Sequence, residues 1–285
     1  MKKMIALLTA AVMLLVFAVG CTNNDSTTSP SPSASASASA SASESASASA
    51  ENAEEVELHI LAAASLTDAM GELKTIYEEK YPNVTLTFTF DSSGTLQTQI
   101  EEGAPADVFV SAAEKQMNAL EEADLIDTAT RVDLLENKLV LIVPENSTLD
   151  IKDFEDAATN EDVKIIGVGN DTVPVGQYTQ AVFEKMGLWD QVSAKANLGD
   201  NVRAVLSWVE SGDVDCGFVY ATDAAVSDGV KVICEAPTEY AEAITYPAAT
   251  VAASEHAEAA KAFVDFLQTS DAAAVFEAAG FTMAK

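Results

Sequence analysis

The sequence is poor in the residues that carry most enzyme chemistry. It contains two histidines, His59 and His256, and three cysteines. It has no His-Glu-x-x-His, Cys-x-x-Cys or Ser-x-x-Lys motif, and no nucleophile elbow. His59 lies inside an apolar stretch and His256 at the polar start of a late helical stretch, so we expect both to be structural or solvent-facing. The absences disfavour metal-dependent and nucleophilic catalysis, and we expect neither enzymatic activity nor a cofactor.

Nucleotide-binding loops are missing as well. No Gly-x-x-x-x-Gly-Lys sequence is present. Gly167-Val168-Gly169 begins like a dinucleotide fingerprint, but Thr172 occupies the position of the third glycine. We interpret this stretch as an ordinary strand-to-helix turn.

Basic residues are scarce. The chain has 15 lysines and arginines against 45 aspartates and glutamates, a formal net charge of −30. Such a domain does not bind nucleic acid, which requires basic patches. It also repels a diffusing anion at long range, so an anion site here must rely on short-range hydrogen-bond donors.

The first twenty residues read as an export signal. Lys2 and Lys3 precede an apolar segment, 5–19, that is too short for a confident membrane span. Ala18-Val19-Gly20 before Cys21 resembles a bacterial lipobox, which implies cleavage at Cys21 and attachment of a diacylglycerol anchor to it. Residues 21–54, rich in serine and alanine, have no apolar face and predict a disordered tether.

The folded part is predicted to be organised around a strand that runs directly into a helix. The apolar run 58–64 ends at Ser65, and an amphipathic segment follows. Ser65, with Asp68 three residues on, predicts a helix cap. The first turn of a helix has unpaired N–H groups and a partial positive charge, so this junction could seat an anion.

Similar junctions recur along the chain. Strands and helices alternate, which predicts an α/β fold whose ligands lie beyond the carboxyl ends of the strands. Helix starts are expected near Ser93, Val175 and Val202, and Tyr220 ends a strand with its hydroxyl at the edge. The strand expected over 244–252 contains a proline, which favours an edge or crossing position.

Cys216 and Cys234 both lie in or beside apolar, strand-like stretches. An extracytoplasmic setting permits a disulfide between them. Two separate thiols are equally compatible with the sequence.

Six motifs together resemble the molybdate-binding proteins of bacterial ABC transporters. They are Ala-Ala-Ser-Leu-Thr at 63–67, Ser-Ser-Gly-Thr-Leu at 92–96, Gly-Ala-Pro-Ala-Asp-Val-Phe-Val-Ser-Ala at 103–112, Val-Pro-Val-Gly-Gln-Tyr at 173–178, Asn-Val-Arg at 201–203 and Gly-Phe-Val-Tyr-Ala-Thr-Asp-Ala at 217–224. The resemblance spans residues 57–281 and implies a type II periplasmic-binding-protein fold. In that fold two mixed sheets flanked by helices close on an oxyanion.

The resemblance also implies a domain division and a ligand set. We expect a first lobe of residues 55–138 and 251–285, and a second lobe of 139–250 that includes hinge strands. The expected ligand groups are hydroxyls or backbone N–H groups of Ser65, Ser93, Val175, Val202 and Tyr220. Asp107 and Arg203 are expected to support the site rather than to touch the ion.

The implied function is capture of molybdate, and of tungstate, by a monomeric receptor anchored to the membrane through Cys21, which delivers the ion to an ABC transporter permease. Asp91 departs from the family pattern, where a small residue is usual. A carboxylate near the ion could accept the proton of hydrogen phosphate, so a receptor for phosphate or sulfate is the alternative; a secreted hydrolase that uses a carboxylate is a more distant one. If Asp91 points to solvent, the departure has no consequence.

Overall fold

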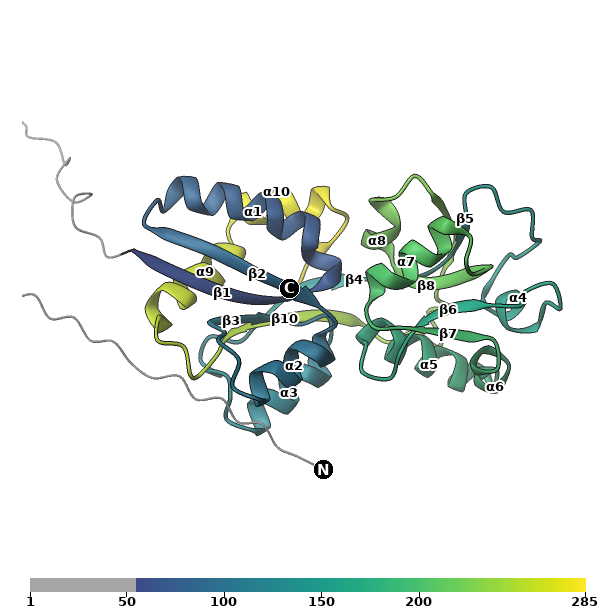
Figure 1. Ribbon diagram of the computed structural model, residues 1–285, viewed down its shortest axis with the longest axis horizontal. Coiled ribbons are helices and arrows are strands. Elements are labelled where there is room, and N and C mark those ends of the chain that lie inside the picture. Colours follow the sequence, from purple (N-terminus) through teal and green to yellow (C-terminus); the bar gives the residue numbers. More distant parts are fainter. Residues whose placement is uncertain (1–54) are drawn as a thin grey trace, which may run out of the picture. The chain divides into compact units, whose positions relative to one another are not determined.

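The computed structural model describes residues 55–285, which belong to one compact unit built on two sheets (Figure 1). The expected signal segment 1–20, the lipidated Cys21 and the tether through residue 54 lie outside the described residues. Within 55–285, no helix combines the length and the apolar character needed to cross a membrane.

The first lobe, residues 55–137 and 244–285, is built on a six-stranded mixed sheet in the order β11-β4-β10-β3-β1-β2. β1 runs parallel to β2 and β3, whereas β10 runs antiparallel to β3 and β4. The strands are β1 Val56–Ala63, β2 Val84–Asp91, β3 Val108–Val110, β4 Val132–Asn137, β10 Ile244–Thr250 and β11 Thr282–Met283. The helices are η1 Ala64–Leu66, α1 Thr67–Lys80, α2 Ser93–Glu101, α3 Glu114–Glu122, α9 Ala257–Leu267 and α10 Ser270–Ala278.

The second lobe, residues 139–235, is built on a five-stranded mixed sheet in the order β7-β6-β8-β5-β9. β6 is parallel to β7 and β8, and β5 is antiparallel to β8 and β9. The strands are β5 Leu139–Pro144, β6 Ile166–Gly169, β7 Ala196–Gly199, β8 Cys216–Tyr220 and β9 Val230–Glu235. The helices are α4 Phe154–Thr159, α5 Pro174–Met186, α6 Trp189–Ser193, α7 Val202–Ser211 and α8 Ala221–Ala225.

Two cores explain why β1 reads as a continuous apolar run. Side chains of β1 that point to one face join the cluster that contains α1 and α9, and Leu61 on the other face packs with α2 and α3. A strand covered on both faces has no polar side to show in the sequence. On the α1 side, the Tyr77 ring meets Phe263 and Phe266 edge-on, each at a centroid distance of 5.0 Å.

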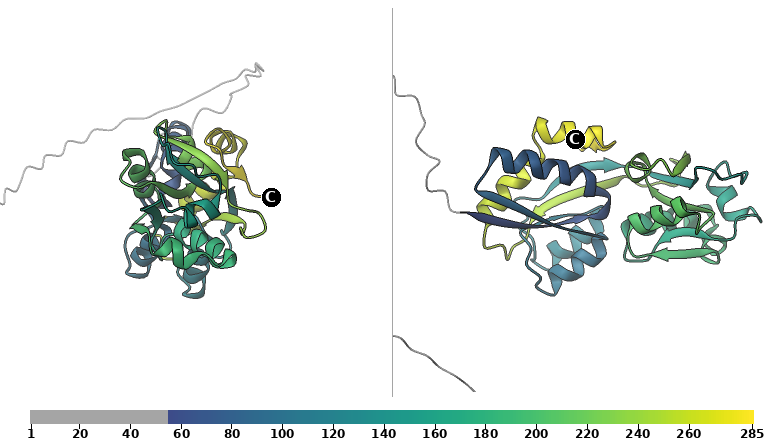
Figure 2. Two further views of the ribbon diagram at one scale, coloured as in Figure 1. Left: turned by 90° about the vertical axis from the view of Figure 1, so that its right-hand side faces the viewer. Right: turned by 45° about the horizontal axis from the view of Figure 1, so that its top comes forward.

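The described chain passes between the lobes twice, at Lys138 and through residues 236–243, and β4 and β10 run side by side next to these crossings (Figure 2). The expected second lobe of 139–250 therefore ends too late, because β10 pairs with β3 and β4 of the first sheet. Of the two strands expected to form the hinge, near 139–143 and 245–251, the second begins only after the 236–243 segment has crossed between the lobes.

β10 is an interior strand of the first sheet, not an edge strand, although its proline favoured an edge or crossing position. The pairing of β10 with β4 shifts register between Tyr246 and Pro247, and such an irregularity accommodates a residue that cannot donate to the ladder. Three strands, β4, β7 and β11, have no counterpart in the sequence prediction. β4 is buried only at Leu134 and Leu135, β7 only at Gly199 and β11 at neither residue, so their hydrophobic patterns are weak.

Cys216 and Cys234 are free thiols, on β8 and β9 respectively. β5 lies between these two strands. Strands two positions apart are separated by about 9–10 Å, beyond the reach of a disulfide.

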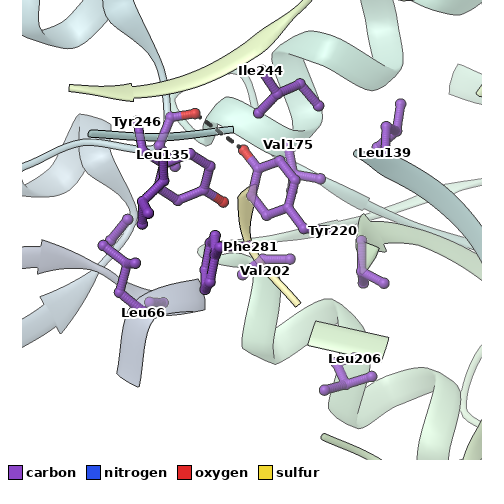
Figure 3. Packing of buried hydrophobic residues seen from close by; sticks show 14 of the residues in the cluster. Leu66, Leu135, Leu139, Val175, Val202, Leu206, Tyr220, Ile244, Tyr246 and Phe281 are labelled. Atoms are coloured by element: carbon purple, nitrogen blue, oxygen red, sulfur yellow. Dashed lines mark hydrogen bonds between the residues drawn. The ribbon is translucent and has the colours of Figure 1, made fainter. Parts of the chain in front are cut away.

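Apolar side chains from both lobes meet between the sheets (Figure 3). Tyr220, at the end of β8, packs against Tyr246 of β10 with ring centroids 5.7 Å apart. Tyr246 in turn meets Phe281 at 5.4 Å. The lobes are thus in contact, and the site described next lies beside this contact.

Candidate functional site

The five residues predicted to bind a ligand line one small cavity between the lobes. The first lobe contributes Ser65 and Ser93, and the second contributes Val175, Val202 and Tyr220. The space open to the centre of a water-sized group is about 10 Å³. That space is about what one water molecule needs, so the cavity as it stands excludes a peptide or a sugar.

Helix N-termini from both lobes surround this cavity. α2 begins at Ser93, α5 at Pro174 and α7 at Val202. N–H groups in the first turn of a helix have no partner within the helix, and the helix dipole makes that end partly positive. The first-turn amides of Val175 and Val202 are therefore suited to an anion.

Side chains define where two of these helices begin. Ser92 Oγ accepts a hydrogen bond from Thr95 N at 3.2 Å, and Asn201 Oδ1 accepts one from Ala204 N at 3.0 Å. The helix start expected near Val202 is confirmed, with Asn201 as its N-cap residue. These caps use the side chains just outside each helix and leave the first amides of the helix without a capping partner.

Ser65 is not a helix cap, which corrects the sequence prediction. A turn of 3₁₀ helix, Ala64–Leu66, intervenes before α1, and the α1 N-cap residue is Leu66, with no capping side chain. The Ser65 hydroxyl instead lies 3.0 Å from the hydroxyl of Tyr246. Ser65 is therefore held by the sheet of its own lobe, at the edge of the cavity.

Two further hydroxyls are placed around residue 112. Ser93 Oγ accepts a hydrogen bond from Ala112 N at 2.9 Å, so its own proton is available for another partner. The Tyr220 hydroxyl donates to Ala112 O across the lobes at 3.5 Å, a long and weak contact. Burial raises the pKa of Tyr220 well above its usual value, so the phenol stays a neutral donor.

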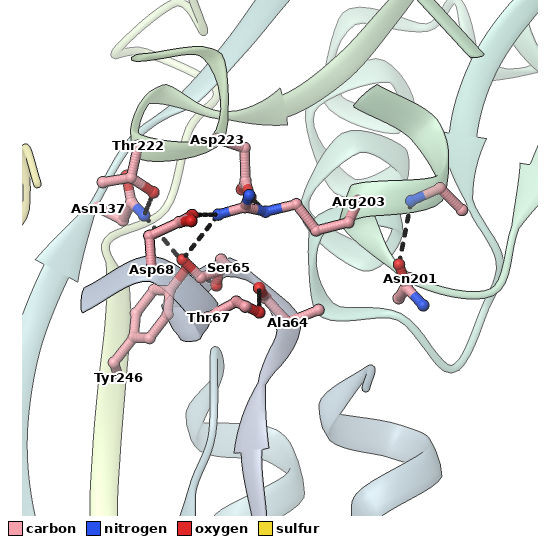
Figure 4. Close-up of polar contacts among 11 residues, drawn as sticks. Ala64, Ser65, Thr67, Asp68, Asn137, Asn201, Arg203, Thr222, Asp223 and Tyr246 are labelled. Atoms are coloured by element: carbon pink, nitrogen blue, oxygen red, sulfur yellow. Dashed lines mark hydrogen bonds and ion pairs between the residues drawn. The ribbon is translucent and has the colours of Figure 1, made fainter. Parts of the chain in front are cut away.

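No lysine or arginine is among the described residues that line the cavity. Arg203 lies nearby, but its guanidinium is directed to carboxylates (Figure 4). Its Nε is 2.6 Å from Asp223 Oδ1, and its Nη2 is 2.7 Å from Asp68 across the lobes. Asp107 is also outside the cavity and accepts hydrogen bonds from His59 N and Ser254.

Asp91 lines the cavity rather than pointing only to solvent. Its Oδ1 accepts hydrogen bonds from Ser92 N at 2.7 Å and, across the lobes, from Asn201 Nδ2 at 3.4 Å. Its departure from the family pattern is therefore a feature of the site. A negative charge at this position bears directly on which anion the cavity accepts.

Gly94 of the first lobe lies close to the backbone of the second lobe. A Cβ added at Gly94, on α2, would fall 2.2 Å from the carbonyl oxygen of Thr172 in the second lobe. That atom belongs to the backbone and cannot turn aside as a side chain could. The observed approach of the lobes therefore depends on a missing side chain.

Gly94→Ala is predicted to prevent full closure. Because a helix tolerates alanine better than glycine, the first lobe should remain folded. The affinity for molybdate, measured by calorimetry, should fall by at least about tenfold, which corresponds to the loss of one or more net hydrogen bonds. Gly71→Ala on α1 is the matched control, since nothing lies within 4 Å of its added Cβ. Equal affinities for the two variants would contradict the role of Gly94.

Asp223 is a fully buried carboxyl on α8 that anchors Arg203. Burial raises its pKa to about 6, although the neighbouring guanidinium acts in the opposite direction. The folded protein thus keeps the proton to about pH 6, whereas the unfolded chain loses it near pH 4. Because the folded state binds more protons in this window, the contribution of Asp223 to stability falls as the pH rises through it.

We predict that the difference in unfolding free energy between the wild-type chain and Asp223→Asn falls by roughly 2 kcal/mol as the pH rises from about 4 to about 6. Urea denaturation across this pH range measures it. Asp228→Asn, which removes an exposed carboxyl from the same lobe, is the control and should show no such trend. A wild-type minus Asp223→Asn difference that stays constant with pH would rule out the buried proton.

Sequence reasoning missed two residues of this region, Asn137 and Tyr246. Asn137 Nδ2 donates to the Tyr246 hydroxyl at 3.1 Å and to Thr222 Oγ1 in the second lobe at 2.9 Å. The sequence held no signal for Asn137, because β4 was not predicted. Tyr246 lay in a predicted strand, but only the sheet pairing brings it beside Ser65.

Comparison with known proteins places the chain in a family. The model of the bacterial extracellular solute-binding protein family matches residues 58–282. A putative ABC transporter substrate-binding lipoprotein of Bacillus subtilis, YvgL, is 36% identical over 282 residues, 99% of each chain. The molybdate-binding protein ModA of Escherichia coli is 40% identical over 237 residues, 81% of this chain and 91% of that protein.

A solved structure agrees with these relatives. The substrate-binding domain of a putative molybdenum ABC transporter from Clostridium difficile is 39% identical, with a TM-score of 0.63, and covers 81% of this chain and 100% of that one. The family model covers most of both lobes, including every residue of the cavity. The chain therefore belongs to the bacterial extracellular solute-binding protein family.

Proposed function

We propose that this protein is an extracytoplasmic receptor that binds molybdate, and also tungstate, and delivers the ion to an ABC transporter permease without chemical change. The observation that carries the proposal is the cavity itself, in which neutral donors from both lobes converge and no described lining residue is a cation. Relatives at 36–40% identity that are named molybdate-binding support the choice of ion.

Energetics permit such a site without basic residues. A desolvated dianion is tolerated only where its oxygens are hydrogen-bonded. Each hydrogen bond to a charged group contributes about 1.5–3 kcal/mol net. About five such bonds, less the cost of association, are compatible with the roughly 8–12 kcal/mol of micromolar to nanomolar binding. The net charge of −30 cannot assist, so these donors must supply the affinity.

Calorimetric titration at neutral pH tests the proposal. Molybdate and tungstate should bind the wild-type chain more tightly than sulfate or phosphate. Ser65→Ala and Ser93→Ala should each weaken molybdate about 10- to 100-fold, because each removes a donor to a charged ligand. Ser193→Ala, at an exposed position, is the control and should leave the affinity unchanged. Equal or tighter binding of sulfate or phosphate would reject the assignment.

Anchoring to the membrane is part of the proposal. The lipobox-like sequence before Cys21 and the name of the B. subtilis relative, a lipoprotein that matches over 99% of the chain, support it. A lipid on Cys21 followed by a tether of about thirty residues would keep a monomeric receptor near its permease.

Asp91 distinguishes molybdate from the alternative, phosphate. An ionised carboxylate repels a fully deprotonated ion but can accept the proton of hydrogen phosphate. Asp91→Asn keeps an oxygen for Ser92 N and removes the charge, so we predict an unchanged or several-fold higher affinity for molybdate and a lower one for phosphate. Calorimetry with both ions measures this. A fall in molybdate affinity of about tenfold or more would show that the carboxylate supports the bound ion.

A further inference from the structure

A chain of hydrogen bonds leads to the Ser65 hydroxyl, and its direction can be deduced. Asn137 ends β4, Tyr246 lies within β10 and Ser65 follows β1, so neighbouring parts of the first lobe supply all three groups (Figure 4). The links are 3.1 Å from Asn137 Nδ2 to the Tyr246 hydroxyl and 3.0 Å from that hydroxyl to Ser65 Oγ.

The orientation of the Asn137 amide is fixed by its other contacts. Its Oδ1 accepts a hydrogen bond from Lys138 N at 2.8 Å. The flipped amide would set its NH₂ group against that N–H, two donors face to face. The NH₂ group therefore faces Thr222 Oγ1 and the Tyr246 hydroxyl, and it can only donate.

The orientation of the Asn137 amide determines the direction of the remaining hydrogen bonds that lead to Ser65. The Tyr246 hydroxyl accepts from Asn137 and must direct its own proton elsewhere. Its ring is fully buried, and burial raises the pKa of Tyr246 well above its usual value, so that proton is retained. With Asn137 as its donor, the Tyr246 hydroxyl is assigned Ser65 Oγ, 3.0 Å away, as its acceptor. Ser65 then has its own proton free to donate into the cavity that it lines.

The Ser93 hydroxyl is also left as a hydrogen-bond donor, but through a different contact. Its Oγ accepts from the backbone N–H of Ala112, so its proton is also free. The Ser65 and Ser93 hydroxyls are thus both prepared as donors before a ligand arrives. Because a protonated oxyanion needs an acceptor for its own proton, such a pair favours ions without one.

We propose that Asn137 and Tyr246 are positioning residues that orient the Ser65 hydroxyl as a donor, and that they thereby favour a fully deprotonated oxyanion over one that carries a proton. This inference rests on the proposed function, in which the cavity holds an oxyanion. Neither residue lines the cavity, so each acts through Ser65.

Tyr246→Phe tests the hydrogen bond between the Tyr246 hydroxyl and Ser65 Oγ. It removes the hydroxyl and keeps the ring that packs on Tyr220 and Phe281. Molybdate affinity should fall about tenfold, the value of one hydrogen bond at the site, with little change in the thermal midpoint. Tyr77→Phe, also buried in the first lobe, is the matched control and should bind as the wild type does.

A double-mutant cycle separates positioning from general destabilisation. In a Ser65→Ala background, Tyr246→Phe should cause no further loss of affinity. An equal additional loss in that background would show that Tyr246 acts by another route and would overturn the inference.

Asn137→Asp tests the direction of the hydrogen bonds that run from residue 137 through Tyr246 to Ser65. A carboxylate at residue 137 would accept a hydrogen bond from the Tyr246 hydroxyl. That hydroxyl would then accept a hydrogen bond from Ser65, so that a lone pair of Ser65 Oγ faces the cavity. In mildly alkaline buffer, molybdate and hydrogen phosphate both carry two charges, so the added charge alone weakens both alike. Reversed polarity should in addition shift the ratio of the two affinities toward phosphate by about tenfold, the value of one hydrogen bond.

An unchanged ratio in Asn137→Asp would contradict the inference. Failure of the proposed function has a different signature, because it appears in the wild-type chain as a preference for another ion. If that ion is sulfate, the Tyr246→Phe cycle measured with sulfate still tests the orientation of Ser65.

Discussion

Replacement of the water around an anion by fixed, uncharged donors is the interaction on which the rest of this structure depends. A desolvated dianion is stable only where hydrogen bonds saturate its oxygens. The cavity draws on both lobes, since Ser65 and Ser93 come from one and Val175, Val202 and Tyr220 from the other. In the proposed function the site is complete only when the lobes meet, so that closure and binding are one event.

Several features that seem unrelated follow from this requirement. Gly94 lacks a side chain because the Thr172 carbonyl must pass close to α2. Arg203 spans the lobes from Asp223 to Asp68 and keeps its charge out of the cavity. Asn137 reaches both Tyr246 and Thr222, so the hydrogen bonds that orient Ser65 also touch the second lobe. Closure is thus supported by polar contacts around the cavity as well as by the tyrosine contact beside it.

Most of the site could be predicted from the sequence because its donors sit at strand-to-helix junctions, which local pattern reveals. Pro174 and Asn201 mark helix starts by their own chemistry, whichever sheet they join. The remaining features depend on which strands pair in the folded protein. β10 was assigned to the wrong lobe because strand partners leave no local trace, and Ser65 was taken for a cap because a short 3₁₀ turn resembles the start of a helix. Tyr246 and Asn137 act through contacts 181 and 109 residues distant in sequence, which no periodicity encodes.

The central claim is that neutral donors of both lobes, without a cation, hold the ion. A crystal structure of the chain with molybdate, using anomalous scattering from molybdenum to locate the ion, tests it most directly. The account predicts a single peak in the cavity bounded by Ser65, Ser93, Val175, Val202 and Tyr220, with Arg203 still paired to Asp223. A peak elsewhere, or an ion in direct contact with the Arg203 guanidinium, would contradict it.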